Sequence, residues 1–263
     1  MAADILPRYY QIKETIKKWI VEKEFEFGEK IPSENELATK FNVSRLTVRQ
    51  AVSQLIQEGF LKTRRGAGTF VAANKELINS YNIEFSGFMD DLFYLASRSK
   101  TKRAEINRIK TPKYIKSKLQ LPDKNNEIIQ IKRTRYISNR SFAYTLNYIP
   151  VDIGKKIKKT ALLKKPLLQI LEQDLGVQFT EAFQTMEASF ADRQLAENLG
   201  IPSGSPILFM ERVMYIKKQV PFEVVQSSYR GDLYKYVTRL KPIRRKAGSF
   251  WVQQGDYGLP GKK

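Results

Sequence analysis

The sequence predicts an α+β protein with two domains: three helices and a β-hairpin, then a larger domain built around one mixed or antiparallel sheet. Its 263 residues exceed what one compact module usually needs. Through the first seventy residues, apolar side chains recur at helical spacing. Beyond residue 105, strand patterns repeat at an offset of 79 or 80 residues.

The composition excludes several kinds of site. The chain has no cysteine and no histidine, so disulfides, thiolate metal sites and Ser-His or Cys-His nucleophile pairs are excluded. We expect no metal and no cofactor. No apolar run approaches the ~20 residues that a membrane-spanning helix needs, and the N-terminus lacks the apolar stretch of a signal peptide. The sequence therefore predicts a soluble, cytoplasmic protein with no membrane partner.

The net charge of +19 lies mostly outside the helical domain. Residues 1–72 contain 12 Lys/Arg and 9 Asp/Glu, a balance of +3, whereas residues 73–263 contain 34 and 18, a balance of +16. Nucleic-acid binding by the first domain must therefore depend on where its charges lie. The basic second part favours anionic ligands or proximity to DNA, and an ordinary solvated surface is the alternative.

The first two helices are marked by an apolar face and by end signals. Residues 7–24 place apolar side chains on one helical face. Ser33 and Glu36 have the spacing of a capping box, which predicts a second, short helix. Asn42 suits a left-handed turn, and Ser44 suits the N-cap of a third helix. Two helices joined by so short a turn are typical of a helix-turn-helix.

The third predicted helix, residues 45–58, has an apolar face and a polar face. The apolar positions at i, i+3, i+4 and i+7 are Val48, Ala51, Val52 and Leu55. The opposite face carries Leu46, Arg49, Gln50 and Ser53. Arg49 can donate two hydrogen bonds to guanine, Gln50 can bind adenine and Leu46 can contact a thymine methyl. Arg45 and Thr47 lie in the first turn, where a helix N-terminus favours phosphate oxygens.

A β-hairpin is predicted after the third helix. Residues 60–64 and 69–71 have strand patterns around the loop Arg65-Gly66-Ala67-Gly68. Arginines and exposed glycine amides suit a phosphate backbone or the minor groove. A plain helical domain is the alternative, because a lone amphipathic helix with one arginine is usually a surface helix. The order of capped helices and hairpin favours DNA binding.

The first domain resembles the winged helix of GntR-type regulators. The likeness covers nearly all of residues 7–71, in the motifs Pro7 to Ile12, Ile31-Pro32-Ser33-Glu34, Leu37-Ala38, Val43-Ser44-Arg45, Thr47-Val48-Arg49, Leu55 with Glu58-Gly59, and Gly66 with Gly68 to Val71. The resemblance implies that Arg45, Thr47, Arg49 and Gly66 contact operator DNA. The full predicted DNA-binding set is Arg8, Ser33, Ser44, Arg45, Leu46, Thr47, Arg49, Gln50, Arg65 and Gly66. Asn35 stands where the family often has arginine, which weakens one expected contact on the second helix.

The repeat lies behind a predicted linker, residues 72–84, whose sequence could also include a turn of helix or an added strand. Each copy has a strand, a short helix, a turn and a long hairpin. The first hairpin is predicted to pair residues 127–137 with 142–149, and the second to pair 206–216 with 221–229. A helix over residues 166–175 lies between the copies. Two hairpins with helices on one side suggest an α+β domain around one sheet.

Polar residues on these strands are candidates for a pocket between the hairpins. Arg133 and Arg135 share a strand face by period two, and half-buried arginines are costly unless an anion pairs with them. Glu223, Ser228 and Tyr229 can hydrogen-bond a polyol. A solvated face is the alternative for the arginines, and ordinary strand-end polar groups are the alternative for the others.

The second domain resembles the UTRA effector domain, which follows the winged helix in the HutC subfamily of GntR regulators. The likeness covers about residues 85–240, in the motifs Phe85-Ser86-Gly87-Phe88, Arg133-Thr134-Arg135, Asn147-Tyr148-Ile149-Pro150 and Ser228 to Asp232. It implies a chorismate-lyase-like fold, a homodimer and a small polar effector, often a phosphorylated sugar. The predicted effector site is Ser86, Phe88, Arg133, Arg135, Tyr148, Glu223, Ser228 and Tyr229. Tyr144 stands where many members have an acidic residue, which removes one expected contact to a sugar hydroxyl. We expect the domain to span residues 85–246, with a tail over 247–263 that either docks on the sheet through Phe250, Trp251 and Tyr257 or is a flexible or non-native segment.

Both resemblances imply a ligand-responsive transcription regulator, a repressor of a sugar or small-metabolite operon. Its expected partners are a palindromic double-stranded operator, a small anionic or polyol effector and a second copy of the chain. An enzyme is the alternative, because the second fold resembles a lyase. Without histidine and cysteine, however, only carboxylates, lysine, tyrosine and arginine could act in catalysis. A constitutive architectural DNA binder is disfavoured by the domain behind the linker.

Overall fold

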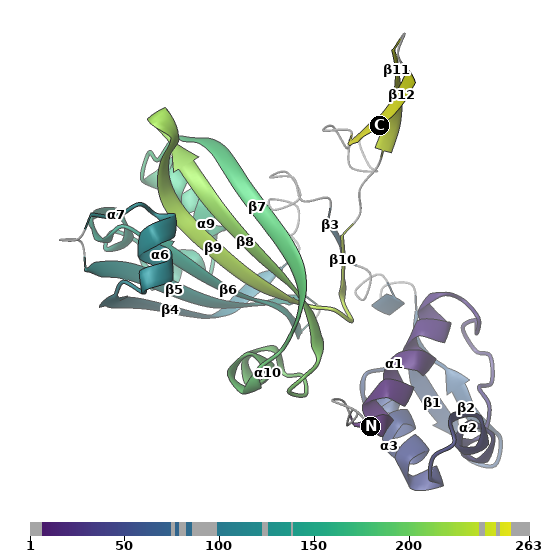
Figure 1. Cartoon of the computed structure of the whole chain (residues 1–263). Helices are drawn as coiled ribbons and strands as arrows, with labels where there is room; N and C mark the ends of the chain where they lie inside the picture. Colours follow the sequence, from purple (N-terminus) through teal and green to yellow (C-terminus); the bar gives the residue numbers. More distant parts are fainter. Residues whose placement is uncertain are drawn as a thin grey trace. The chain divides into compact units, whose positions relative to one another are not determined.

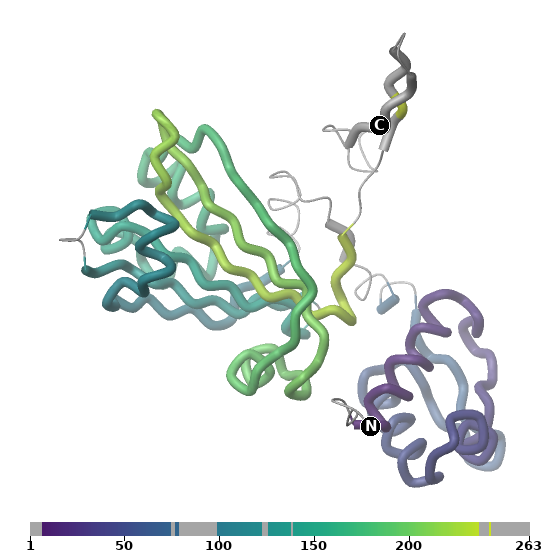
Figure 2. The backbone as a smooth tube through the Cα atoms, viewed as in Figure 1, coloured from purple at the N-terminus to yellow at the C-terminus, as the bar shows by residue number. Residues whose placement is uncertain are grey.

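The computed structural model describes residues 7–74, 77–78, 83–85, 99–122, 126–137, 139–236, 240–245 and 248–253. Contacts between Cα atoms divide the chain into two compact units. The first unit comprises Met1–Asn82, Met186–Met210 and Ser227–Leu233, and the second comprises Ile83–Thr185, Glu211–Gln226 and Tyr234–Lys263. Figure 1 labels the elements of both units, and Figure 2 traces the backbone.

Three helices and a hairpin form the N-terminal domain, which confirms the predicted order. The helices are α1 (Arg8–Val21), α2 (Glu34–Phe41) and α3 (Arg45–Gln57). The hairpin consists of β1 (Leu61–Arg64) and β2 (Gly68–Val71), which pair antiparallel. Val48, Ala51 and Leu55 have no solvent exposure, so the predicted inward face of α3 is confirmed.

Local hydrogen bonds set the starts of α2 and α3. The Ser33 hydroxyl accepts from the Glu36 N–H at 3.3 Å, and the Glu36 carboxylate accepts from the Ser33 N–H at 2.7 Å. This reciprocal pair is the predicted capping box. Asn42 has a φ of 50°, the left-handed conformation expected of it, and Ser44 Oγ accepts from the Thr47 N–H at 3.2 Å. The short turn between the two helices is therefore specified by its own residues.

Helix α1 buries two lysines among carboxylates. The Lys13 Nζ lies 2.9 Å from Glu58, the C-cap residue of α3, and the Lys17 Nζ lies 3.4 Å from the same carboxylate. Lys17 also lies 3.4 Å from Asp232, in the segment Ser227–Leu233 of the same unit. Burial lowers the pKa of Lys13, but Glu58 and Glu14 outweigh burial and leave this pKa raised. The neighbouring carboxylates therefore favour the charged form of Lys13 although it is buried.

Asp232 is paired a second time, by an arginine two residues before it. Arg230 donates to the Asp232 carboxylate from Nε at 2.9 Å and from Nη2 at 2.6 Å. Burial raises the pKa of Asp232, but Arg230 and then Lys17 and Lys13 outweigh burial and hold this pKa well below its usual range. The cluster formed by Lys13, Lys17, Glu58, Arg230 and Asp232 is called the ion cluster below.

The second domain is built on a six-stranded sheet with the order β4-β5-β6-β9-β8-β7. The strands are β4 (Lys100–Lys110), β5 (Glu127–Ile137), β6 (Arg140–Ile149), β7 (Phe179–Phe190), β8 (Pro206–Ile216) and β9 (Val220–Arg230). Both predicted hairpins are present: β5 pairs antiparallel with β6, and β8 leads into β9 through the short 3-10 helix η2 (Lys217–Gln219). The two hairpins are adjacent in the sheet because β6 neighbours β9.

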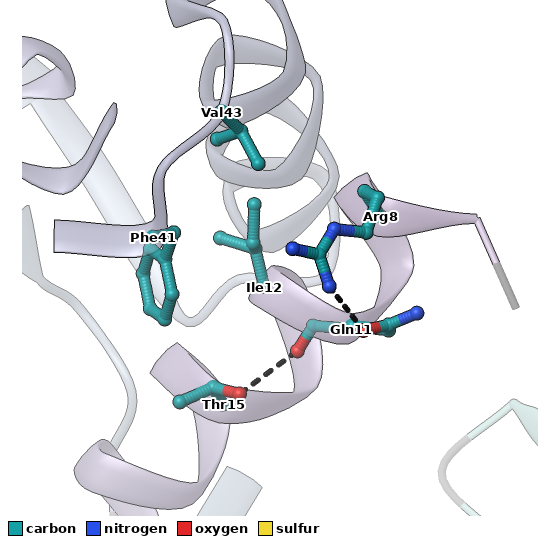
Figure 3. Close-up of a pocket in the computed structure, with 6 residues that line it drawn as sticks. All are labelled: Arg8, Gln11, Ile12, Thr15, Phe41 and Val43. Atoms are coloured by element: carbon teal, nitrogen blue, oxygen red, sulfur yellow. Dashed lines mark hydrogen bonds between the residues drawn. The ribbon is translucent and has the colours of Figure 1, made fainter. Parts of the chain in front are cut away.

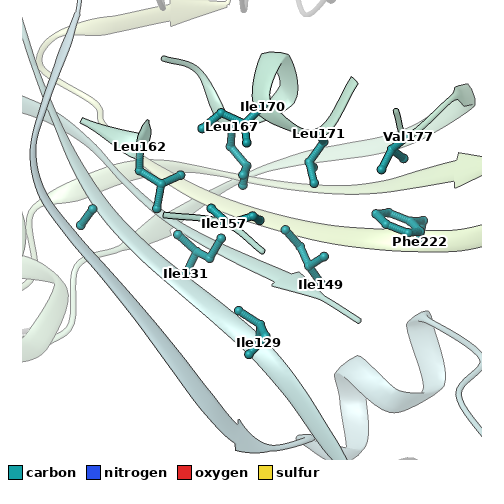
Figure 4. Close-up of a cluster of buried hydrophobic side chains, with 11 residues drawn as sticks. Ile129, Ile131, Ile149, Ile157, Leu162, Leu167, Ile170, Leu171, Val177 and Phe222 are labelled. Carbon is teal, nitrogen blue, oxygen red and sulfur yellow. The ribbon is translucent and has the colours of Figure 1, made fainter. Parts of the chain in front are cut away.

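A hydrophobic core covers one face of the sheet (Figure 4). Short helices supply its outer layer: α7 (Val151–Gly154), α8 (Lys159–Leu162), α9 (Leu167–Gln169) and the π-helical turn η1 (Ile170–Asp174). Leu162, Leu167 and Leu171 from this layer pack with Ile131 and Ile149 of the sheet. Two of these elements, α9 and η1, together correspond to the single helix that the sequence predicts over residues 166–175.

A second, smaller core includes Ile115 of α6 (Lys113–Lys118). It joins Ile115 to Ile128, Tyr148, Val213 and Val224 of the sheet. Neighbouring residues of β5, Ile128 and Ile129, belong to different cores because successive side chains of a strand point to opposite faces.

Helix α10 (Arg193–Leu199) is capped by Asp192, whose carboxylate accepts from the Leu195 N–H at 2.7 Å.

The buried carboxylate of Glu211 fixes α6 to the sheet. Tyr114 donates to it from its hydroxyl at 2.6 Å, the Lys118 Nζ lies 3.0 Å away, and Gln226 donates from Nε2 at 2.9 Å. Burial raises the pKa of Glu211, but these three donors outweigh burial and leave this pKa lowered. Glu211 is thus satisfied within the fold.

The structure adds strands in two places where the sequence predicted a linker and a tail. Ile83 and Glu84 of the predicted linker belong to β3 (Ile83–Phe85), which pairs parallel with β10 (Tyr234–Tyr236). In the predicted tail, β12 (Gly248–Gln253) pairs antiparallel with β11 (Leu240–Arg245). Pairing of β3 with β10 joins segments about 150 residues apart, so no local sequence pattern could show it.

Replacing Lys17 with methionine tests the ion cluster. We expect Lys17→Met to lower the free energy of unfolding by roughly 2–3 kcal/mol, below the usual cost of breaking a buried pair because Lys13 and Arg230 still compensate the carboxylates. Urea unfolding measures this change. Lys18→Met is the matched control: Lys18 is 69% exposed, and we expect its loss to cost less than ~0.5 kcal/mol. Equal effects of the two substitutions would contradict a stabilising role for the cluster.

Candidate nucleic-acid interface and buried polar site

The polar face predicted for α3 is solvent-exposed. Arg45, Leu46, Arg49 and Gln50 are all exposed, and Leu46 is 73% exposed. An exposed leucine on a helix that already buries its other face has no packing role in the described fold. This surface, with its leucine, glutamine and arginines, matches the side-chain types that read base edges in a major groove.

Glu34 holds both arginines of this face. Its carboxylate accepts from the Arg45 Nε at 3.4 Å and from the Arg49 Nε at 3.2 Å. Since both bonds use Nε, the terminal nitrogens of the two arginines can still donate to a base or a phosphate. The sequence analysis placed Glu34 only in the capping motif, because a contact between the first turn of α2 and the middle of α3 depends on how the helices cross.

Other residues predicted to contact DNA form hydrogen bonds within the domain. Ser33 and Ser44 cap α2 and α3, and the Ser44 and Thr47 hydroxyls lie 2.8 Å apart. Arg8, at the start of α1, donates to the Gln11 side chain at 3.3 Å. Figure 3 shows Arg8 beside a small pocket that is lined by Gln11, Ile12, Thr15, Phe41 and Val43. Arg8 therefore lies close to the turn between α2 and α3.

The tip of the β1–β2 hairpin is exposed at Arg65 and Gly66. Gly66 has a φ of 75°, which favours glycine, and Gly68 has a φ of 119°. A Cβ at Gly68 would lie 2.6 Å from the Lys30 side chain. The glycines therefore shape a tight, basic tip that presents backbone amides, as the sequence analysis predicts for a wing.

The sheet of the second domain buries a chain of polar side chains. Arg133 of β5 donates to the Asn147 side chain of β6 at 3.0 Å, and Asn147 donates to Glu223 of β9 at 2.7 Å. Glu223 is only 3% exposed. Arg212 of β8 adds a positive charge near Glu223 and donates to Gln184 of β7 from Nε at 2.9 Å. Arg133, Asn147, Glu223 and Arg212, called the polar site below, thus join four strands.

Glu223 has an unusual titration for a carboxyl group. Burial raises its pKa to about 7, although Asn147, Arg133 and Arg212 act in the opposite direction. The surrounding residues therefore compensate the buried charge only in part. A carboxyl group that titrates near neutrality can accept a hydrogen bond from a ligand hydroxyl or, when protonated, donate one.

Arg135 has different partners from Arg133. Its Nη2 donates to the Ser99 hydroxyl at 2.6 Å, and its guanidinium lies 5.4 Å from the centre of the Phe142 ring. The register of β5 against β6 shifts between Arg135 and Tyr136. Arg133 and Arg135 are thus close on one strand, and only Arg133 bonds to Asn147 among the contacts described for the two.

Tyr148, a predicted effector residue, lies on the face of β6 opposite to Asn147. Its ring packs in the smaller core with Ile115, and its hydroxyl accepts from Gln130 at 3.1 Å. The neighbouring residue Asn147 faces Arg133 instead, because adjacent residues of a strand point to opposite faces.

Ser228 and Tyr229 are buried farther along β9, in the stretch that belongs to the first unit. Ser86 and Phe88 lie outside the described residues. The sequence analysis did not include Asn147 and Arg212 among the candidate site residues. Asn147 belonged to one of the motifs of the UTRA resemblance, and Arg212 matched Arg133 in the repeat, but neither signal pointed to a site.

The residues that the structure describes contain no group of three or more acidic side chains that could hold a metal ion. Within the same residues, none of the helices has the length and apolarity needed to cross a bilayer.

Replacing Glu223 with glutamine tests the titration of the polar site. The folded-state pKa of Glu223 is raised from 4.5 to about 7, so the stabilisation linked to its proton is present below pH 4.5 and is lost as the pH rises through about 7. We expect Glu223→Gln, which stays neutral, to gain stability over the native protein as the pH rises, by on the order of 1.4 kcal/mol per pH unit between the two values. Melting temperatures from pH 5 to pH 8.5 measure the difference.

Glu187→Gln, which removes one carboxylate from an exposed position of β7, is the control for the loss of a charge. A melting-temperature difference between Glu223→Gln and the native protein that does not vary with pH would contradict the raised pKa.

Comparisons with known proteins match both the N-terminal domain and the second domain. The model of the gntR family of bacterial regulatory proteins matches residues 8–71, and the UTRA domain model matches residues 96–235. The HTH-type transcriptional repressor NagR of Bacillus subtilis (strain 168) is 29% identical over 232 residues, covering 88% of this chain and 94% of its own. A probable fructoselysine utilization operon transcriptional repressor of Escherichia coli O157:H7 is 26% identical and covers 85% of this chain and 90% of its own.

Solved structures show the same fold. A possible transcriptional regulator, YydK of Bacillus subtilis, has a TM-score of 0.51 at 23% identity and covers 89% of this chain and 99% of its own. The ligand-binding domain of a putative GntR-family regulator from Bordetella bronchiseptica has a TM-score of 0.51 at 25% identity and covers 56% of this chain and 91% of its own. The relatives are transcriptional regulators and not enzymes. The chain therefore belongs to the GntR family of bacterial transcriptional regulators and carries a UTRA domain behind its DNA-binding domain.

Proposed function

We propose that this chain is a repressor of a sugar or small-metabolite utilisation operon, and that a small polar effector, a phosphorylated sugar, releases or retunes it on its operator. The polar site carries this proposal. Folding alone gains little from burying Arg133, Asn147 and Glu223 together, because desolvation costs about as much as the pairing returns. Buried ionisable groups with shifted pKa values are typical of ligand sites.

On the DNA side, α3 is the recognition helix. Arg49, Gln50 and Leu46 would contact base edges, and Arg45 and the wing residues Arg65 and Gly66 would contact phosphates. A homodimer would place two such helices in successive major grooves of a palindromic operator, about 34 Å apart. A protein with this task works on the chromosome, in the cytoplasm.

On the effector side, the arginines would bind the anionic group and Glu223 with Asn147 would bind hydroxyls. A phosphate fits Arg133 and Arg135, because guanidinium groups donate paired hydrogen bonds to phosphate oxygens. The sugar is suggested by the name of the fructoselysine repressor, whose chain matches this one over most of its length. Operator and effector would each weaken the binding of the other by the same factor.

A thermal-shift assay tests the effector site. We expect glucosamine 6-phosphate or glucose 6-phosphate to raise the melting temperature, and Arg133→Ala and Arg135→Ala each to abolish the shift. Arg108→Ala is the matched control, since Arg108 is an exposed arginine of the same sheet that pairs with Glu127. A shift that survives in both site variants would contradict the placement of the anion at these arginines.

Binding to DNA duplexes enriched from a random pool tests the recognition helix. We expect Arg49→Ala to weaken binding by 1–3 kcal/mol, roughly 5- to 150-fold, and to relax the preference at one base pair. Lys18→Ala removes the same charge from an exposed site on α1 and should change binding little. Equal losses in the two variants would mean that overall charge, and not the α3 face, determines affinity.

A further inference from the structure

Positive charge in the second domain gathers in one short stretch of the chain. Residues 153–165 contain six lysines and no aspartate or glutamate. The next stretch, residues 166–192, reverses this balance with five carboxylates and no lysine or arginine. Soluble surfaces ordinarily intersperse charges of both signs, and a field of one sign is typical of a surface that attracts a charged partner.

The fold places these lysines on the outer side of the helical layer. Ile157 and Leu162 belong to the larger core, at 5% and 1% exposure. Gly154 brings the chain close to the sheet, because a Cβ at this position would lie 2.6 Å from the Ile129 side chain. The apolar side chains thus cover the sheet, and the lysines between them lie on the surface.

Five of these exposed lysines have no opposite charge beside them. Lys165 is exposed too, but its Nζ lies 2.9 Å from Asp174. Among the residues that the structure describes, no carboxylate lies within ion-pair distance of the other five. These five, called the lysine face below, are Lys155, Lys156, Lys158, Lys159 and Lys164.

Strand β4 extends the lysine face along one edge of the sheet. Helix α8 contacts this strand, which has five lysines and arginines among its 11 residues and Glu105 as its one acidic residue. At the opposite edge, β7 has Glu181 and Glu187 and no basic residue (Figure 1). The sheet therefore has a basic edge and an acidic edge. The field of a polyanion would turn the basic edge towards it.

We propose that the lysine face and β4 form a second DNA-contact surface, which binds the phosphate backbone beside the sequence that α3 reads. The inference rests on the DNA binding in the proposed function and extends it to the second domain. Lysine binds phosphate as a point charge, without the planar fork by which arginine recognises guanine. The lysines and β4 spread over two short helices and a strand, which suits an extended polyanion. The surface should add affinity without sequence preference.

Flanking DNA tests this surface. The probe is the operator enriched from the random pool, as a bare duplex and with about three helical turns of unrelated sequence added on each side. The native chain should bind the longer duplex more tightly, by on the order of tenfold for each added phosphate contact at about 0.1 M salt. Lys155→Gln/Lys156→Gln and Lys158→Gln/Lys159→Gln should each weaken binding to the longer duplex by roughly tenfold or more. Both variants should bind the bare duplex as the native chain does.

Lys217→Gln/Lys218→Gln is the matched control. It also removes two adjacent, exposed lysines from the second domain, but these lie in η2, at the turn between β8 and β9. We expect this variant to keep the native affinity for the longer duplex. Because all the substituted lysines are exposed, the melting temperatures of the three variants should stay near the native value and show that they fold.

The salt dependence of binding gives a second measurement. Each phosphate contact contributes about 0.9 to the slope of log affinity against log salt concentration. On the longer duplex, we expect each lysine-face variant to lower this slope by up to about 1.8 and the control to leave it unchanged.

Two kinds of result would overturn the inference. A native chain that binds both duplexes equally, or lysine-face variants that match the control on the longer duplex, would make the lysine face an ordinary solvated surface. Binding to the bare duplex would then still support α3 as the recognition helix. A native chain that binds neither duplex would overturn both this surface and the DNA binding in the proposed function.

Discussion

A buried charge is stable only beside opposite charges or hydrogen-bond donors, and this constraint determines which elements must meet in both units. In the first unit, Lys17 needs carboxylates from two different places, the end of α3 and the segment after β9. In the second, Glu223 needs Asn147 on the neighbouring strand, and Asn147 in turn accepts from Arg133. These contacts therefore require specific helix crossings and a specific strand order, which apolar packing alone would leave less defined.

The two charge clusters differ in how far they are compensated. Arg230 and the lysines overcome the effect of burial on Asp232, whose pKa is lowered. Around Glu223, burial prevails and the pKa is raised to about 7. The ion cluster is complete within the fold, whereas the polar site keeps a carboxyl group that further hydrogen bonds would stabilise. This difference distinguishes a structural cluster from a candidate ligand site more clearly than residue type does, because both contain arginines and carboxylates.

Local signals in the sequence predicted much of the fold, but contacts between segments far apart in the sequence were not predicted. The capping box at Ser33 and the left-handed Asn42 depend on residues within a few positions of each other, the two long hairpins each join strands that follow one another along the chain, and all are present. Asn147 and Glu223 meet only because β6 and β9, 76 residues apart, are neighbours in the sheet. Tyr148 and Asn147 are neighbours in one motif but face opposite sides of the sheet, and a motif does not show which face carries a site, because one residue of shift exchanges the two faces.

Strand β9 links the two clusters through the backbone. Glu223 lies near its start, Arg230 is its last residue, and Asp232 follows two residues later. Because β9 is hydrogen-bonded to β6 on one side and to β8 on the other, the strand that brings Glu223 to Asn147 also carries Arg230 to its pairing with Asp232. Both buried clusters therefore depend on the same strand order.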